Sequence, residues 1–505
     1  MAWIWRCAMG LAVWAALGCD SGASTEGGGG TGGDGGGGGG VVCPEDPLEG
    51  PIPEDCGIWV SASQGDDANE GTQSAPVASL THAIELASRG KGRVYACGET
   101  WTEALTVPSG VSLHGGFDCE DGWQYTGEAR RAMLVPPTPL AIKWGDVDSE
   151  EQVFLTEFYV EAPTATEPGA SSIGILVIPT LPLKILRCEV VAGDGADGAD
   201  GAPGDADDQP AAAGAPGNDG GGACSAPVSA GGVSPESACE AGLSKGGKGG
   251  DGGVFQAESG APGEPAGPGG AGGLGEEAAP ACTGGAPGAD GAHGENGAGG
   301  TGKGYGLMTA DGIVGYPGQD AQPGMPGQGG GGGGATFGNT ATCGAASPGG
   351  AAGGSGGAGG CGGKGGRGGQ AGGSSVAVAN LGKGEDLLMD YTVLRAGNGG
   401  NGGKGGAPQG GGAGGPGGKG GVGAGTIQPG CSGGDGGNGG KGGYGGGGSG
   451  GSSAAIGTAS GMGPFFQMHL EYSHGKAGEG GMGDPAHVKW YGTDGVANPV
   501  LPFDK

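Results

Sequence analysis

The sequence predicts a mainly β fold: a parallel β-helix, in which short strands stack as successive turns of one coil, interrupted by long glycine-rich insertions. The first observation behind this prediction is a repeat. Residues 171–195, 374–399 and 452–480 each open with Ser-Ser, continue through small apolar residues and a turn, and end in an alternating strand followed by glycine. Gly193 lies 22 residues after Ser171, and Gly397 lies 23 residues after Ser374. That spacing suits one turn of such a coil, here called a rung.

The second observation is the uneven distribution of glycine. The chain has 505 residues and 142 glycines, of which 15 lie in residues 41–192 and 112 in residues 191–505. Aromatic residues make up only 5% of the chain. A fairly ordinary N-terminal region is therefore joined to a glycine-dominated region that has too few large side chains for an extensive packed core.

The N-terminus is typical of an exported protein. Arg6 precedes a short apolar run, Ala8 to Leu17, which is shorter than the roughly 20 residues that span a bilayer and fits the apolar part of a signal peptide. Ala16-Leu17-Gly18-Cys19 resembles the lipobox of bacterial lipoproteins, although that family prefers Leu where this chain has Ala16. The resemblance implies a lipoprotein signal peptide at 1–18 and lipidation of Cys19. The alternative is an ordinary signal peptide followed by a coincidental cysteine.

Residues 19–42 are predicted to be a flexible linker, because they are rich in glycine and serine and contain no apolar anchor before Val41. We therefore expect an exported cell-envelope lipoprotein, attached to the membrane through its N-terminal lipid. Asp20 resembles an inner-membrane retention signal of enteric bacteria, but that rule varies among bacteria and leaves the leaflet open. The outer membrane or the cell surface is favoured over the periplasmic face of the inner membrane.

Thirteen cysteines fit an oxidising compartment. Removal of Cys7 with the signal peptide and lipidation of Cys19 leave an odd number, so at least one thiol stays free or bonds another chain. The candidate disulfides, in order of preference, are Cys43 with Cys56, Cys97 with Cys119, and Cys224 with Cys239. Four further cysteines, Cys282, Cys343, Cys361 and Cys431, could link the glycine-rich segments.

Residues 43–192 are predicted to form a capped β-helix region. Short strands are expected at Ile58–Ser61, Arg93–Ala96, Ala104–Val107 and Val111–His114. Ser79 can cap a helix in which Leu80, Ala83, Ile84 and Ala87 form an apolar stripe. The phrases Trp59-Val60-Ser61, Gly65-Asp66-Asp67, Ser79-Leu80 and Gly110 to Phe117 resemble the start of right-handed parallel β-helix proteins of the pectate-lyase-like superfamily. The resemblance implies that this helix covers the open end of the coil, and it carries little information about function.

The rest of the chain is predicted to alternate between insertions and rungs. Glycine-rich insertions are expected at 193–373, with a possible weak rung near 305–314, and again at 397–451. Rungs are expected at 374–396 and in the C-terminal region and tail, 452–505.

The glycine tracts are mostly Gly-Gly-X, as in residues 357–373. In a polyglycine-II-like helix with three residues per turn, each X would lie on one solvent-facing ridge and the two glycine ridges would pair with neighbouring helices. Disorder is the open alternative, because ordering glycine is costly. The composition resembles the PGRS regions of mycobacterial proteins and PGRS-like glycine-rich lipoproteins, although the mycobacterial Pro-Glu N-terminal domain is missing.

These features favour a structural or surface-interaction protein, adhesion-like and without catalytic activity or a cofactor. A formal net charge of −31 argues against nucleic acid, and a surface polysaccharide or protein is the expected partner. The alternative is a carbohydrate-binding or polysaccharide-lyase-like β-helix protein. The rungs offer charged residues for that chemistry, but not a convincing set: Lys184, Arg187, Glu189, Asp390, Arg395 and Glu471.

Three further possibilities are weaker. A flat polyglycine surface could bind ice if its X ridges formed a regular plane. His469, His474 and His487 could bind a metal. The spacing of Asp194, Asp197 and Asp200 is vaguely similar to that of calcium repeats but lacks their alternation.

Overall fold

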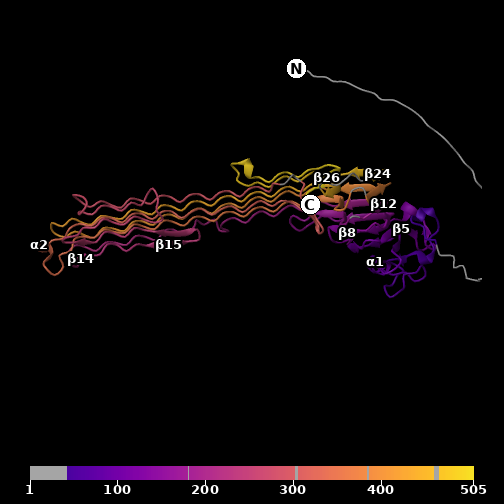
Figure 1. Cartoon of the computed structure of the whole chain (residues 1–505), viewed down its shortest axis with the longest axis horizontal. Coiled ribbons are helices and arrows are strands. Elements are labelled where there is room, and N and C mark those ends of the chain that lie inside the picture. Colours follow the sequence, from indigo (N-terminus) through magenta and orange to yellow (C-terminus); the bar gives the residue numbers. More distant parts are fainter. Residues whose placement is uncertain (1–41, 180, 302–304, 384–385, 460–465) are drawn as a thin grey trace, which may run out of the picture. The chain divides into compact units, whose positions relative to one another are not determined.

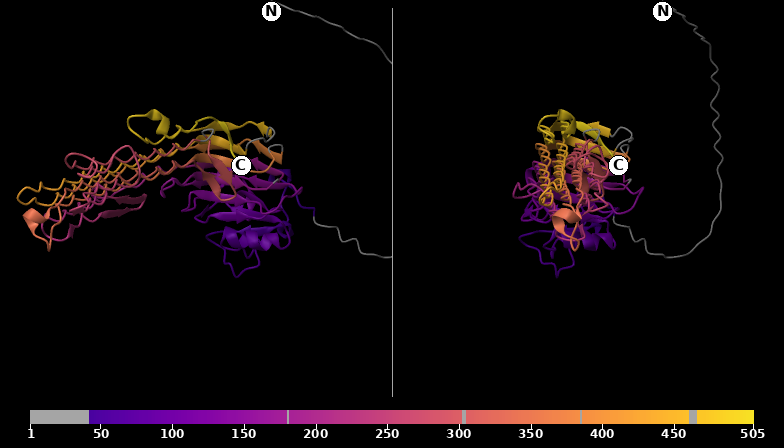
Figure 2. Two further views of the ribbon diagram at one scale, coloured as in Figure 1. Left: turned by 60° about the vertical axis from the view of Figure 1, so that its left-hand side comes forward. Right: turned by 90° about the vertical axis from the view of Figure 1, so that its left-hand side faces the viewer.

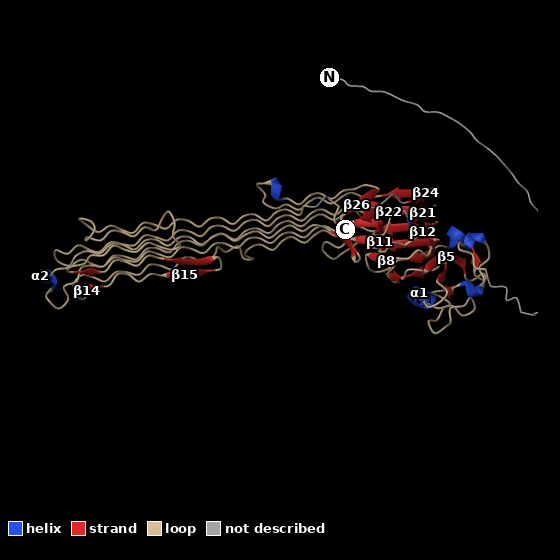
Figure 3. Cartoon of the chain, viewed as in Figure 1, coloured by secondary structure: helices blue, strands red, loops and turns tan. Residues whose placement is uncertain are grey.

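A computed structural model describes residues 42–179, 181–301, 305–383, 386–459 and 466–505. Residues Cys43–Lys505 form one compact unit, which is mainly β and is built on parallel sheets (Figure 1). The sheets lie in one part of this unit. The glycine-rich segments, which are neither helix nor strand by backbone assignment, run side by side away from them (Figure 3).

Three parallel sheets make up the strand-rich part, and the chain passes through them in turn. Sheet A contains β1 (Ile58–Val60), β2 (Arg93–Cys97), β5 (Ser112–Asp118), β9 (Val153–Thr156), β12 (Leu183–Leu186), β21 (Leu387–Asp390) and β24 (Phe466–Met468). Sheet B contains β3 (Thr100–Trp101), β7 (Ala132–Leu134), β10 (Phe158–Ala162), β13 (Glu189–Ala192), β22 (Val393–Ala396) and β25 (Glu471–Ser473). Sheet C contains β4 (Leu105–Val107), β8 (Leu140–Trp144), β11 (Ser172–Val177), β20 (Ser375–Asn380), β23 (Ser453–Ala459) and β26 (Val500–Phe503).

The N-terminal helix α1 (Leu80–Ser88) begins where the sequence predicts. The Ser79 hydroxyl accepts a hydrogen bond from the backbone N–H of His82, and Leu80, Ala83, Ile84 and Ala87 are buried. Short 3-10 helices (Pro47–Glu49, Glu54–Cys56, Gly127–Arg130 and Val488–Trp490) and the strand β6 (Gln124–Tyr125), antiparallel to β5, complete the strand-rich part and its tail.

The Ser-Ser repeat is confirmed by strand register. Ser172 pairs with Ser375, and Ser375 pairs with Ser453, across β11, β20 and β23. Each repeat supplies one strand to each of the sheets C, A and B. Buried apolar side chains stack in the same register, as in Leu113, Leu155, Ile185 and Met389 along sheet A. This stacking lets each rung bury its apolar face against the next.

The glycine-rich excursions all leave the strand-rich part at one junction, between a strand of sheet B and the following strand of sheet C. They connect β13 to β20, β22 to β23, and β25 to β26. The second serine of the Ser-Ser pair forms hydrogen bonds across this junction in two of the repeats. Ser375 Oγ donates to Gly193 O at 2.7 Å and accepts from Gly397 N at 2.8 Å, and Ser453 Oγ bonds Gly397 O and Gly475 N in the same way.

The prediction of a weak rung near 305–314 is wrong. β18 (Leu307–Thr309) and β19 (Gly312–Val314) form an antiparallel hairpin, so they do not add a rung to the parallel stack. Met308 and Ile313 are buried against Ile173 and Val376 of sheet C. The hairpin forms because a two-residue turn, Ala310-Asp311, precedes Gly312, and its apolar residues are buried on the outside of an existing sheet.

Hydrogen bonds in the glycine-rich segments recur every three residues. Gly195, Gly198, Gly201 and Gly204 donate in turn to the carbonyls of Asn398, Asn401, Lys404 and Ala407. Segments 397–421 and 430–451 run in opposite directions, whereas 194–220 and 398–421 run in the same direction. We call the set of segments that pair in this way the glycine bundle (Figure 2). Short antiparallel pairs, β14 (Val228–Ser229) with β17 (Gly252–Gly253) and β15 (Glu236–Cys239) with β16 (Gly242–Lys245), and the helix α2 (Thr340–Cys343) interrupt it.

The number of neighbouring segments determines the residue at X. Segment 349–373 bonds with six others (194–221, 226–232, 247–250, 318–336, 398–421 and 430–451). Its X residues Ala352, Ser355, Ala358 and Cys361 are buried, which corrects the expectation that X ridges face solvent. Along 329–334 every residue is glycine and buried, because neighbours approach all three ridges. An added Cβ at Gly331 would lie 2.0 Å from the carbonyl oxygen of Ala271. The charged X residues Lys364, Arg367, Lys404 and Lys419, by contrast, are exposed.

Candidate functional site

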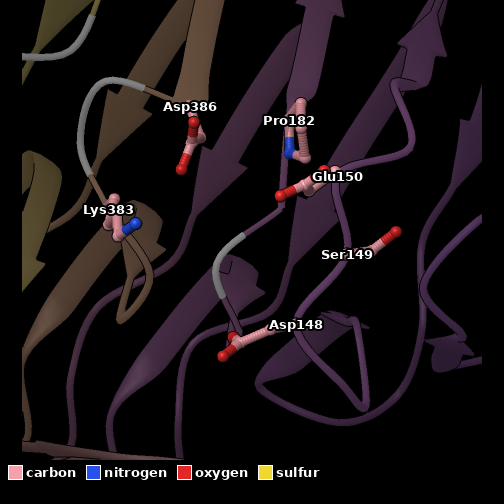
Figure 4. Close-up of a pocket in the computed structure, with 6 residues that line it drawn as sticks. All are labelled: Asp148, Ser149, Glu150, Pro182, Lys383 and Asp386. Atoms are coloured by element: carbon pink, nitrogen blue, oxygen red, sulfur yellow. The ribbon is translucent and has the colours of Figure 1, made fainter.

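The best candidate for a ligand site in the strand-rich part is an open groove of about 540 Å³ at the junction between sheets C and A (Figure 4). Residues from three loops line it: the β8–β9 loop, the end of the β11–β12 loop at Pro182, and the β20–β21 loop. Its lining residues are Asp148, Ser149, Glu150, Pro182, Lys383 and Asp386. Three carboxylates and one lysine therefore line one groove.

The groove has chemistry that suits an ionic or hydroxylated ligand. Asp148, Glu150 and Lys383 are exposed, and Asp386 is half-buried. Carboxylate oxygens are the ligands that calcium prefers, and an amine beside them can act as a base once it is deprotonated. Sequence reasoning missed this site. The only local signal was the acidic run Asp146 to Glu151, and Lys383 joins it through parallel stacking of rungs more than 200 residues apart.

The charged residues that the sequence singled out on the rungs are not brought together into a site. Arg187 forms ion pairs with Asp46 at 2.8 Å and with Glu157. Glu189 bonds Arg395 at 3.0 Å. The Lys184 ammonium lies 5.2 Å from the centre of the Phe154 ring, and Asp390 bonds His469 at 3.1 Å. Glu471 is exposed on β25, the last strand of sheet B. Apart from Glu471, these residues pair within or between neighbouring rungs.

Arg187 belongs to a stack of residues with left-handed backbone at the junction from sheet A to sheet B. Glu157, Arg187, Tyr391 and His469 each follow a strand of sheet A, with φ of 52°, 54°, 48° and 42°. Tyr391 and His469 stack with ring centres 4.3 Å apart. Glu157 is fully buried, and burial raises the pKa of its carboxyl, opposed by hydrogen bonds from Arg187 and Tyr125. The Glu157 carboxylate therefore joins Tyr125 to Arg187 of the next rung through Oε1.

The three histidines near the C-terminus do not converge. His469 bonds Asp390, His474 Nδ1 lies 2.9 Å from the carbonyl oxygen of Gly475, and His487 bonds Asp484 at 2.9 Å. Across the described residues, the only potential metal-ligand cluster is Cys97, Glu99 and Cys119, and its two cysteines are joined in a disulfide. The histidines therefore act as surface hydrogen-bonding groups.

Asp194, Asp197 and Asp200 have a structural role. Their Oδ1 atoms accept hydrogen bonds from the backbone N–H groups of Asn398, Asn401 and Lys404 at 2.6, 2.6 and 2.7 Å. Asn398 and Asn401 in turn accept from Lys476 and Glu479 at 2.9 Å. The three-residue spacing matches the period of the glycine bundle, so it places one acceptor opposite each X residue of the neighbouring segment.

The disulfides follow the sequence only in part. Cys43 pairs with Cys56 and Cys97 with Cys119. The predicted disulfide between Cys224 and Cys239 is wrong. Cys224 pairs with Cys343, and Cys239 pairs with Cys361. Each of these bonds joins segments that become neighbours only when the chain returns through the bundle. The fifth disulfide joins Cys282 to Cys431.

Cys188 is the free thiol among the described residues. It is fully buried, and burial raises its pKa to about 12, so it is neither a nucleophile nor available to another chain.

Cys19 lies outside the described residues, so its lipidation remains a prediction. Within the part of the chain that the structure describes, no helix combines the length and the apolar character needed to cross a bilayer. Comparisons with protein families, with curated proteins and with solved structures find no match to this chain.

Proposed function

We propose that this protein is an exported, lipid-anchored structural and surface-interaction protein of the bacterial cell envelope. In this proposal a right-handed parallel β-helix serves as a platform, and the glycine bundle is a stiff arm that presents a binding surface away from it. Catalysis has no part in the proposal. The observation that carries it is the network of inter-segment hydrogen bonds in the glycine bundle, which repeats every three residues.

The right-handed coil is supported by the order of the strands. Successive strands return to the same three sheets in parallel, and crossover connections between parallel strands are right-handed in nearly all proteins. The three-residue period and the unbroken glycine ridges support polyglycine-II geometry for the bundle, by analogy with polyproline II.

Stiffness of the arm is supported by contacts that side chains and disulfides add to the backbone network. Glycine pays more conformational entropy on ordering than other residues, and one net hydrogen bond returns only about 1 kcal/mol. The carboxylates of Asp194, Asp197 and Asp200 satisfy N–H groups that backbone carbonyls do not reach. Three disulfides restrict the unfolded bundle.

The envelope location rests on the resemblance of Ala16 to Cys19 to a lipobox and on the oxidised cysteines. The composition of the tracts supports a relationship to PGRS-like glycine-rich lipoproteins. Mass spectrometry of the protein from bacterial membranes tests the anchor: a diacylglyceryl group on Cys19, absent from Cys19→Ala, is expected. A Cys19→Ala protein that stays in the membrane fraction contradicts it.

Hydrogen exchange of the full chain, analysed by mass spectrometry, tests the stiff arm. We expect peptides from 352–373 and 398–421 to be protected as strongly as Leu183–Ala192 of β12 and β13. Exchange of these peptides at the rate of an unfolded chain would contradict the proposal, since the arm would then be a flexible spacer.

A second function, a carbohydrate-binding or lyase-like activity, is favoured by the groove of Asp148, Glu150, Lys383 and Asp386. In a lyase, the Lys383 amine would take the proton from the carbon beside the uronate carboxylate. The C–H electrons would form a C=C bond as the glycosidic C–O bond breaks, and the oxygen would leave with that bond's electrons. Incubation with polygalacturonate and calcium tests this. The activity would be established if unsaturated products form, if Lys383→Gln abolishes them, and if the control Lys404→Gln does not affect them.

A further inference from the structure

We infer that the end of the glycine bundle farthest from the sheets is a docking surface for a protein segment that is both apolar and basic. This inference rests on the proposed function and names the binding end of the arm and the chemistry of its partner. Five loops meet there, in residues 218–230, 251–259, 273–283, 335–349 and 419–431, and we call them the tip. Figure 1 shows β14 and α2, which belong to these loops, at the end of the bundle.

Large apolar side chains of the tip are exposed to solvent. Phe255 is 94% exposed and Val422 is 75% exposed. Val228, Leu274 and Phe337 are 43%, 46% and 36% exposed. Elsewhere in the described part of the bundle most exposed X positions are polar or charged, and the other exposed large apolar residues are Val233, Leu243, Met325 and Met482. Concentration of such residues at one end of a soluble protein is typical of an interaction surface.

Backbone contacts join the tip loops. Val228 pairs with Gly253, Gly253 O accepts from Gly338 N at 2.9 Å, and Ala223 N donates to Val422 O at 2.9 Å. The backbone N–H of Phe337 donates to Glu276 Oε2 at 2.7 Å. Phe255, Phe337 and Val422 are therefore presented by loops that are bonded to one another, not by separate tails.

The tip is covalently fixed. Cys224 is bonded to Cys343 and Cys282 to Cys431, so two of the five disulfides lie in these loops. The Asn339 side chain caps α2 by accepting from Thr342 N at 2.7 Å. Loops held in this way keep their apolar side chains exposed instead of collapsing over them, and binding then costs little ordering entropy.

Charge selects the partner. The tip loops carry five carboxylates (Asp219, Asp251, Glu258, Glu276 and Glu277) against one lysine, Lys419. Lys248, beside these loops, pairs with Asp251 at 2.9 Å, and the tip remains net negative. An anionic lipid surface would be repelled, and so would the tip of a second copy. A protein segment with apolar residues between lysines or arginines complements both the exposed side chains and the charge.

The test uses dye-labelled peptides and the full chain at physiological salt. The probes are an amphipathic Leu/Lys peptide, the same peptide with Glu in place of Lys, and a Ser/Lys peptide. We expect the Leu/Lys peptide to bind at least tenfold more tightly than either of the others. Phe255→Ser should weaken its binding at least fivefold. Val147→Ser, which removes a 61% exposed side chain from the β8–β9 loop, should not change it.

Several outcomes would overturn the inference. Equal binding of the Ser/Lys peptide would mean that net charge alone attracts it, and unchanged binding by Phe255→Ser would place the contact elsewhere. Flotation with phosphatidylcholine vesicles that depends on Phe255 would make the tip a membrane surface. A dimer that Phe255→Ser dissociates would make it a self-association surface. If exchange shows a protected bundle and the peptide does not bind, the tip inference fails and the stiff arm stands.

Discussion

Asp194 and Asn398 lie 204 residues apart in the sequence, yet the carboxylate of Asp194 accepts a hydrogen bond from the backbone N–H of Asn398 at 2.6 Å, and Gly195 N donates to the carbonyl of Asn398 at 2.8 Å. The same two-bond contact recurs at Asp197 with Asn401 and at Asp200 with Lys404. The glycine ridges therefore supply uniform pairing, while short carboxylate side chains complete the pairing at each X residue.

Removing these acceptors should loosen one edge of the bundle. In the triple variant Asp194→Ala, Asp197→Ala, Asp200→Ala, three N–H groups lose their partners, and one net hydrogen bond is worth about 1 kcal/mol. We expect amide exchange in 398–404 to accelerate roughly fivefold per site, with little change in the sheets. The control is Asp207→Ala, whose carboxylate has no hydrogen-bond partner among the described residues. Equal effects of both variants would show that loss of negative charge, not loss of the acceptors, is the cause.

A methyl group in the bundle interior should be far more damaging. At Gly356 an added Cβ would lie 1.9 Å from the carbonyl oxygen of Gly330, so Gly356→Ala must separate two hydrogen-bonded segments. Overpacking costs about 1–3 kcal/mol even where side chains can move aside. We expect Gly356→Ala to abolish exchange protection in 352–360 and 327–333.

The matched control for this substitution is Gly90→Ala in the turn after α1. No atom lies within 4 Å of its added Cβ, so the unfolding free energy should be unchanged or slightly higher. Normal protection in Gly356→Ala would mean that the segments around Gly330 are not packed as described.

Side-chain patterns in the sequence were enough to predict the strands of the N-terminal region, the cap helix at Ser79 and the Ser-Ser rungs. Each depends on a period of apolar side chains over a short stretch. The hairpin at 307–314 was mistaken for a rung because both patterns are short apolar runs, and periodicity does not distinguish parallel from antiparallel pairing.

The register of the glycine bundle and the position of the tip could not be predicted from the sequence, for a different reason. Pairing between glycine ridges is made by backbone atoms, which are the same at every position. The sequence therefore does not indicate that Cys239 pairs with Cys361 and not with Cys224. The groove at Lys383 depends on that same long-range stacking, since an excursion of more than 180 residues separates β13 from β20.

Loss of a bundle disulfide should destabilise the bundle and spare the sheets. Cys239 and Cys361 are separated by 122 residues, and closing a loop of about 100 residues contributes up to about 4.7 kcal/mol through the unfolded state. We expect the double variant Cys239→Ser, Cys361→Ser to lower the denaturant midpoint for exchange of 350–373 by an amount equivalent to about 2–4 kcal/mol. Peptides covering 183–192 should keep their midpoint. A parallel fall in both regions would show that bundle and sheets unfold as one cooperative unit.

Acid should destabilise the strand-rich part through His114. This side chain is fully buried on β5, its Nδ1 lies 3.1 Å from Thr156 Oγ1, and its ring stacks on Tyr95. Burial lowers the pKa of His114 from 6.5 to about 3. The unfolded chain therefore takes up a proton near pH 6.5 while the folded chain stays neutral, and stability is fully present above pH 6.5 and falls as the pH drops towards 3. Between pH 7.5 and pH 5 the loss should be about 2 kcal/mol.

Denaturant unfolding followed by the fluorescence of buried Trp59 and Trp144 measures this loss of stability. His114→Gln, which does not titrate, should be less stable at neutral pH and lack this part of the pH dependence. A variant with the same slope as the wild type would assign the acid sensitivity to carboxylates instead.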